Sequence, residues 1–131
     1  MAIDQESSAV ALARAHAQAW SNHDLDKARK MLAPDVHVTT ASTQPFVYPT
    51  DFTGIDDYMD GLTKFAQTVE PGSARVIASV GDERNSLILL TIRVAFPPDW
   101  EKATLQMARL ALFDENQKIK QEQVVYFAVP D

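Results

Sequence analysis

The chain has 131 residues, 46% hydrophobic and 23% charged, with a net charge of −6 at pH 7. This length fits one domain, residues 1–131, and the acidic balance argues against nucleic acid and anionic membranes as partners. There is no cysteine, so disulfides and thiolate chemistry are excluded. The sequence begins without the features of a signal peptide, and no apolar run approaches the ~20 residues of a membrane span, so we expect a soluble cytoplasmic protein.

The first part of the chain predicts two helices. Apolar residues recur at spacings of three and four from about Glu6 to Trp20, which is typical of a helix with one buried stripe. Asp24 is expected to cap a second, short helix that buries Leu32 and ends before Pro34. The basic stretch "KARK" at residues 27–30 then forms the solvated side of this helix.

A strand and a long helix follow. Alternation predicts a strand at Asp35–Thr40, in which Thr40 shares the apolar side and His37 faces solvent or a partner. Residues 42–54 are too irregular to assign. Thr53, with Asp56 three residues later, resembles a capping box, and the following apolar stripe predicts a helix over Ile55–Val69. The acidic residues at the start of this helix are interpreted as solvent-face charges and not as a metal cluster.

The rest of the chain predicts a run of strands. They are expected near Ala74–Val80, Ser86–Phe96, Thr104–Phe113 and Lys118–Val129, separated by turn sequences. The order of elements predicts an α+β domain with the helices on one face of an antiparallel sheet of four to six strands. In Ser86–Phe96 both alternating sets are largely apolar, so we expect a homodimer that covers the outer set.

Arg109 interrupts the apolar face of the strand at Thr104–Phe113. If Phe113 pairs with Lys118 across the turn, Arg109 lies opposite Glu122 and Met107 lies opposite Val124. Such an ion pair would compensate for the cost of burying a guanidinium group. Two interpretations remain open, a structural pair on the outer face of the sheet or a pair that lines a cavity.

His16 and Thr40 are further candidates. His16 lies on the apolar stripe of the first helix, where it is either a packed core residue or a catalyst. Thr40, on the apolar side of its strand, is either packed or part of a site. No metal-binding spacing, nucleophile motif or glycine-rich phosphate loop occurs, so no metal or other cofactor is expected.

Several stretches resemble one family. The segments "AWSNHDLDKARKMLAPDV" and "FDENQKIKQEQVVYF", the opening "TGIDDY" of the long helix and the order of elements are similar to the NTF2-like superfamily, in its SnoaL-like and ketosteroid-isomerase-like branch. The resemblance covers nearly the whole chain. It implies a curved sheet wrapped around the helices into a cone, with a deep apolar pocket at the wide end, usually in a dimer.

The resemblance also implies where a site would lie. The tyrosine that ketosteroid isomerases place on the first helix falls on His16, their general-base aspartate on Thr40, and their protonated aspartate on Arg109. None of these three residues is kept, and threonine cannot serve as the base, so steroid isomerisation of that type is not expected.

Three functions therefore compete. The first is a cofactor-independent acid/base enzyme (isomerase, cyclase or lyase type) acting on a small, largely apolar carbonyl compound. Arg109 would stabilise an enolate oxygen, and His16 or Glu122 would move the proton. The second is a pocket without chemistry, in which Arg109 holds a carboxylate or phenolate, and the third is a dimeric scaffold. The residues expected to contact a small apolar or aromatic carbonyl or carboxylate ligand are Trp20, Thr40, Tyr58, Met107 and Tyr126.

Overall fold

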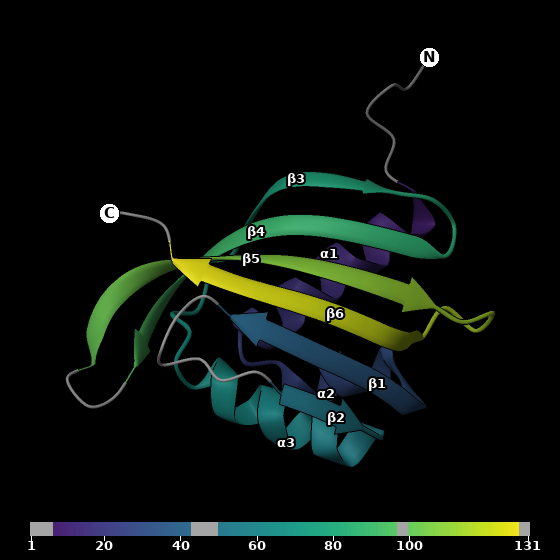
Figure 1. The fold of residues 1–131 in the computed structure, drawn as a ribbon, viewed down its shortest axis with the longest axis horizontal. Helices are drawn as coiled ribbons and strands as arrows, with labels where there is room; N and C mark the ends of the chain where they lie inside the picture. The colour runs from purple at the N-terminus through teal and green to yellow at the C-terminus, as the bar shows by residue number, and fades with distance from the viewer. Residues whose placement is uncertain (1–6, 43–49, 97–99, 129–131) are drawn as a thin grey trace.

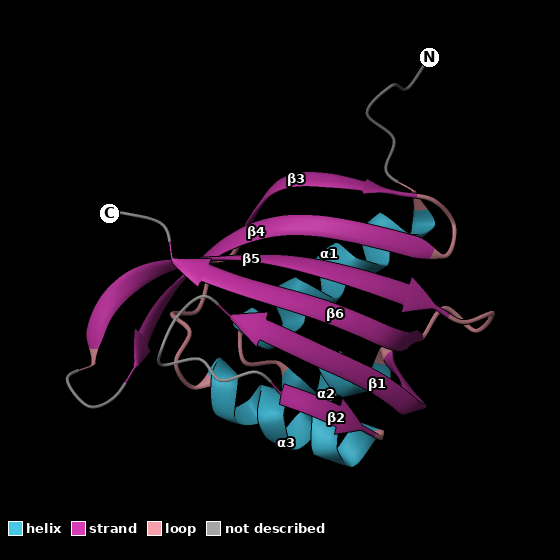
Figure 2. Cartoon of the chain, viewed as in Figure 1, coloured by secondary structure: helices cyan, strands magenta, loops and turns pink. Residues whose placement is uncertain are grey.

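The computed structural model of the chain describes residues 7–42, 50–96 and 100–128. In chain order the elements are α1 (Ser8–Ser21), α2 (Leu25–Lys30), β1 (Leu32–Ser42), β2 (Thr50–Thr53), α3 (Ile55–Ala66), β3 (Arg75–Gly81), β4 (Asn85–Phe96), β5 (Glu101–Phe113) and β6 (Ile119–Ala128). The strands form one curved sheet in the order β2-β1-β6-β5-β4-β3 (Figure 1). The three helices lie on one side of this sheet (Figure 2), which confirms the predicted α+β class.

The small side chains of α1 allow it to pack closely on β3, β4 and β5. Its buried residues include Ala9, Ala13, Ala17, His16 and Trp20. The helix begins at Ser8, two residues later than predicted, because the hydroxyl of Ser7 accepts a hydrogen bond from the N–H of Val10 and caps it. Glu6, the predicted start, lies outside the described residues.

α3 covers the other part of the sheet, at β1 and β2. The predicted capping box at Thr53 is wrong, because the residue before the helix is Gly54 and no side chain caps the helix. Gly54 has a φ of 94°, a conformation that residues with side chains rarely adopt. The helix ends at Ala66 and not at Val69, which instead forms an isolated bridge with Val94.

β1 begins at Leu32, within the segment that was predicted to be helical. The N–H of Ile119 donates to the carbonyl oxygen of Met31, so pairing with β6 begins where α2 ends. The β1–β6 ladder is irregular between Leu32 and His37, which accommodates Pro34, a residue with no N–H to donate.

The sheet is mixed, whereas the sequence predicted antiparallel pairing throughout. β1 and β6 are parallel neighbours, and the other pairs are antiparallel. A parallel pair needs a long connection, which the segment between β1 and β6 provides. β2 lies inside the segment left unassigned and pairs with β1 at the edge of the sheet.

The register of β5 and β6 differs by two residues from the predicted one. Arg109 pairs with Val124 and not with Glu122. A hydrogen bond from the N–H of Asp114 to the carbonyl oxygen of Lys118 closes a turn one residue shorter than predicted, and a bulge in β6 adds the second residue. Because an even offset leaves every side chain on its own face, Arg109 and Glu122 remain diagonal neighbours on the same face.

The side chains of β4 alternate between the inner and the outer face of the sheet. Its buried set comprises Ile88, Leu90, Ile92 and Val94. The outer set includes Leu87, which pairs with Leu110 of β5, and these side chains are 42% and 43% exposed. Val125 of β6 is 42% exposed on the same face. The outer face of the central strands therefore carries a group of exposed apolar side chains.

Candidate ligand pocket

A pocket of about 220 Å³ lies between α3 and the inner face of the sheet. It is lined by Val38 and Thr40 of β1, Thr50 and Phe52 of β2, Tyr58, Gly61, Leu62, Lys64 and Phe65 of α3, Arg109 of β5, and Glu122, Val124 and Tyr126 of β6. Lys64 is 75% exposed and its amine lies 3.1 Å from a carboxylate oxygen of Asp60, so this charge belongs to the rim. The buried charges of the described wall are those of Arg109 and Glu122.

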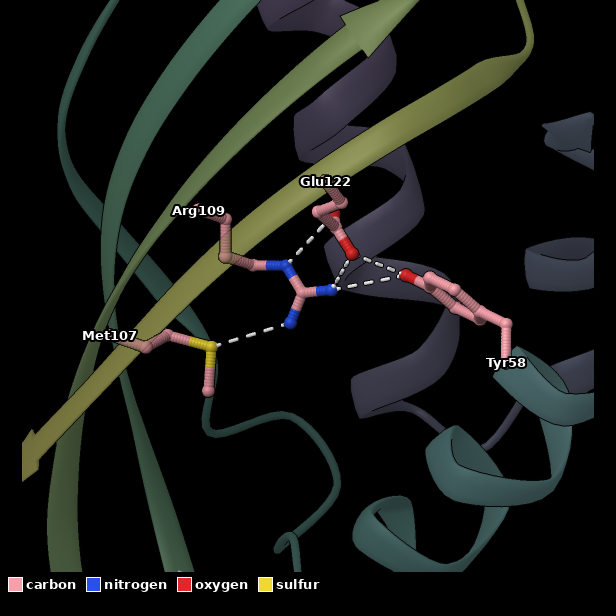
Figure 3. Close-up of polar contacts among 4 residues, drawn as sticks. All are labelled: Tyr58, Met107, Arg109 and Glu122. Carbon is pink, nitrogen blue, oxygen red and sulfur yellow. Dashed lines mark hydrogen bonds and ion pairs between the residues drawn. The ribbon is translucent and has the colours of Figure 1, made fainter. Parts of the chain in front are cut away.

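Arg109, Glu122 and Tyr58 form one hydrogen-bonded cluster (Figure 3). Arg109 Nη2 donates to Oε1 of Glu122 at 2.6 Å, and Nε donates to Oε2 at 3.2 Å. The hydroxyl of Tyr58 donates to the same Oε1 at 2.5 Å and accepts from Nη2 at 3.2 Å. The side chains of Arg109 and Glu122 are only 5% and 3% exposed, so each charge depends on the other for compensation.

Softer contacts also surround Arg109. Its Cζ atom lies 5.0 Å from the centre of the Trp20 ring, a cation–π contact. Nη1 donates to the sulfur of Met107 at 3.6 Å, and a thioether is a weak acceptor. Trp20 and Met107 therefore contact the guanidinium without lining the pocket themselves.

The protonation states of the cluster are fixed near neutral pH. Burial raises the pKa of Tyr58 well above its usual range, and the charge of Glu122 raises it further. Burial disfavours the charged form of Glu122, yet Arg109 holds the pKa of this carboxyl below its ordinary value. Burial acts against the charge of Arg109 as well, and Glu122 outweighs it, so the pKa of Arg109 is raised. The cluster thus combines a guanidinium, a carboxylate and a neutral phenol, with a net charge of zero.

His16 lies beside Tyr58, and the centres of the two rings are 6.3 Å apart. Its side chain is buried, and its Nε2 atom has no hydrogen-bond partner among the described residues. Burial lowers its pKa to about 4, against the opposing effect of Glu122. The imidazole is therefore neutral at pH 7. This placement favours a packed core residue over a proton carrier for a ligand in the pocket.

Contacts with β2 shape another part of the wall. The Thr40 hydroxyl oxygen accepts from the N–H of Thr50 at 2.8 Å, and the two hydroxyl groups share a hydrogen bond of 2.6 Å. Phe52 lies against α3 at Gly61, where an added Cβ atom would be 2.7 Å from the ring. Gly61 therefore makes room for this aromatic ring.

The structure brings most of the predicted site residues to one place. Thr40, Tyr58, Arg109, Glu122 and Tyr126 line the pocket, whereas His16, Trp20 and Met107 lie behind it. The Arg109–Glu122 pair is on the inner face of the sheet, so the outer-face interpretation does not hold.

Sequence reasoning missed several residues of the wall. Thr50 and Phe52 lie on a strand of four residues inside a segment that lacks a periodic pattern. Leu62 and Phe65 could have been found, because they follow Tyr58 on the predicted helical stripe. The irregular segment gave no comparable signal.

Some charged residues outside the pocket form ion pairs at the surface. Arg29 pairs with Asp56 at 2.6 Å, and His37 pairs with Asp51 at 2.7 Å. Within the described ranges, no three His, Asp or Glu side chains are grouped so that they could hold a metal ion. The helices in the described part of the chain are too short or too polar to cross a membrane.

The family model of the SnoaL-like domain matches residues 13–122. This match covers most of the chain, which therefore belongs to the SnoaL-like domain family. No curated protein matches the chain.

Solved structures of the same fold were found. A protein of Kribbella flavida has a TM-score of 0.74 at 17% identity, with 92% of this chain and 88% of that chain covered. A steroid delta-isomerase of Pseudomonas aeruginosa has a TM-score of 0.65 at 17% identity, with 92% and 80% covered. A protein of Catenulispora acidiphila with a ketosteroid isomerase-like fold, in complex with trimethylamine, has a TM-score of 0.67 at 14% identity, with 86% and 82% covered. The likeness shows that this chain has the ketosteroid isomerase-like fold of NTF2-like proteins.

Proposed function

We propose that the pocket binds a small, largely apolar compound that carries a carbonyl or similar oxygen. The observation that carries this proposal is the Arg109–Glu122–Tyr58 cluster, a fixed polar group in a wall that is otherwise mainly apolar. This combination is typical of small-molecule sites. The pocket volume of about 220 Å³ lies below the range of drug-sized sites, so we expect a small ligand.

Cofactor-independent proton transfer is the second candidate function. It is favoured by the presence of a carboxylate, Glu122, and a cation, Arg109, on the same wall, where the first would take a proton and the second would stabilise an enolate oxygen. Binding has the stronger support, because a general base works best with a pKa near the working pH. Arg109 instead lowers the pKa of Glu122, and burial lowers that of His16 to about 4.

A titration with neutral aromatic ketones, beginning with acetophenone, tests the binding proposal. We expect the amide signals of pocket residues to shift in nitrogen–proton NMR spectra. Arg109→Met combined with Glu122→Gln should weaken binding about tenfold or more, a loss of ~1.4 kcal/mol, because the polar anchor is gone. Arg75→Met, an exposed change on β3, is the matched control and should bind as the wild type does. Equal binding by the double variant and the wild type would mean that the cluster is a structural network.

Proton exchange separates the two candidate functions. In deuterated water, an enzyme would exchange the methyl protons of acetophenone for deuterium faster than they exchange in buffer alone. Glu122→Gln would abolish this acceleration. Glu115→Gln, an exposed change in the turn between β5 and β6, should leave it intact. Binding without exchange would support the pocket without chemistry.

We also propose that the protein forms a homodimer through the outer face of its sheet. Leu87 and Leu110 face each other across β4 and β5, Val125 lies on the neighbouring strand, and each is more than 40% exposed. A contiguous apolar patch of this kind is unusual for a monomer, and a two-fold contact would cover it in both copies. Light scattering should give a dimer mass at micromolar concentration, and Leu110→Lys should give a monomer. A monomer mass for the wild type would reject this proposal.

A further inference from the structure

We infer that Glu122 determines which ligand charge the pocket accepts, and that the pocket selects uncharged molecules over carboxylates of the same size. This inference rests on the proposed binding function and names the ligand class of the same site. It follows from the charge balance of the described wall.

The two buried charges of the wall cancel each other. Glu122 receives two hydrogen bonds from the guanidinium of Arg109, and both side chains are almost fully buried. The remaining charged side chain of the described wall, Lys64, is largely exposed and already pairs with Asp60. An incoming anion would therefore find no uncompensated positive charge in the described interior.

A carboxylate ligand would be disfavoured for two reasons. It would lose its hydration on entering a largely apolar pocket, and the loss is large for an ionised group without a partner. It would also approach the carboxylate of Glu122, which occupies the Nε and Nη2 donors of Arg109. Electrostatic repulsion therefore adds to the cost of desolvation.

An uncharged carbonyl compound avoids both costs. Its oxygen needs one donor. The guanidinium of Arg109 lines the pocket, and its Nη1 atom carries two N–H groups, one of which donates to the thioether sulfur of Met107 at 3.6 Å. A neutral oxygen would accept from Arg109 or from the hydroxyl of Tyr126, both of which line the pocket. The apolar part of such a compound would contact the surrounding side chains, which include Val38, Leu62, Phe65 and Val124.

Glu122 is consequently a determinant of specificity. Glu122→Gln keeps the size of the side chain and removes its charge, which leaves the Arg109 guanidinium uncompensated in the same wall. A guanidinium without a carboxylate partner is a strong site for a carboxylate ligand. The substitution should therefore change the preferred ligand and not merely weaken binding.

The test compares acetophenone with benzoate, two aromatic probes of similar size that differ in charge. At pH 7 we expect the wild type to bind acetophenone at least tenfold more tightly than benzoate. Glu122→Gln should bind benzoate at least tenfold more tightly than the wild type does. Glu115→Gln changes the net charge equally at an exposed turn and should keep the wild-type preference.

Each outcome decides the inference. Equal or tighter binding of benzoate by the wild type would overturn the inference and leave the proposed binding function intact. Absence of binding of either probe would overturn both. If Glu122→Gln does not fold, the ratio of the wild-type affinities for acetophenone and benzoate decides the inference. The double variant Arg109→Met with Glu122→Gln has neither buried charge, and it should bind benzoate no more tightly than the wild type does.

Discussion

Removing one charge of the Arg109–Glu122 pair should destabilise the fold far more than removing both. Arg109→Met keeps much of the packing of the stem but leaves the Glu122 carboxylate buried and alone. Glu122→Gln leaves the guanidinium in the same state. Because these side chains are only 5% and 3% exposed, water replaces the lost partner only in part. Each single substitution should therefore lower the free energy of unfolding by about 3–5 kcal/mol.

The double variant should behave differently. With both charges removed, no buried charge is left without a partner, and an uncharged replacement of a buried pair is often tolerated. We expect its free energy of unfolding to lie within ~2 kcal/mol of the wild type. If each single substitution costs ~3 kcal/mol and the double variant loses ~2 kcal/mol, the double variant is still ~4 kcal/mol more stable than the sum of the single effects implies.

Urea unfolding of the four proteins measures this difference, and a constant slope would show that the transitions are comparable. The Glu70–Lys102 pair, with an N–O distance of 2.9 Å and largely exposed side chains, is the control cycle and should be close to additive. Additive effects at Arg109 and Glu122 would refute the reasoning, since independent buried charges cannot be compensating each other.

Three other substitutions give distinct expectations. Tyr58→Phe removes a hydrogen bond to a charged group, so the free energy of unfolding should fall by about 1.5–3 kcal/mol. NMR titration should also show a higher pKa for Glu122, and an unchanged pKa would contradict the hydrogen bond between Tyr58 and Glu122. The pKa of His16 is about 4 in the folded protein, against an ordinary value of 6.5, so the unfolded chain binds this proton first and stability should fall as pH decreases from 6.5 to 4. His16→Phe should flatten melting temperature against pH in that window, and an unaltered slope would count against this assignment. Gly61→Ala places a Cβ atom 2.7 Å from the Phe52 ring and should weaken acetophenone binding without lowering the melting temperature, because alanine favours the helix. Normal binding by this variant would mean that the ring moves away freely.

The regular elements were predictable because their burial is one-sided. The stripe of α3 has a period of 3.6 residues, and the helix begins at Ile55 as predicted, although it ends at Ala66. β4 is a long apolar segment bounded by turn sequences, and it begins one residue before the predicted range. β2 could not be found in this way, because four residues are too few to establish a period. The start of β1 at Leu32 depends on pairing with β6, a contact that the local sequence does not contain.

The site was predictable in part for the same reason. Arg109 and Glu122 were expected on one face, and the two-residue offset of the hairpin preserved that face. Tyr58 was expected to contact the ligand, but its hydrogen bond to Glu122 joins elements that are far apart in the chain. No pattern within a single helix or strand predicts such a contact, so it could be identified only from the three-dimensional structure.

The place of β6 in the sheet has a consequence for folding. β6 is the last strand in sequence and lies between β1 and β5, so it joins the two parts of the sheet. During synthesis, β1 and β5 both emerge before their common neighbour, and each then presents an unpaired edge. The parallel contact between Val38 and Glu122 closes a long loop, which slows folding. Until β6 inserts, the nascent chain exposes two strand edges that are paired in the folded sheet, and it has only half of its buried ion pair. It is in this interval that a chaperone would protect it from aggregation.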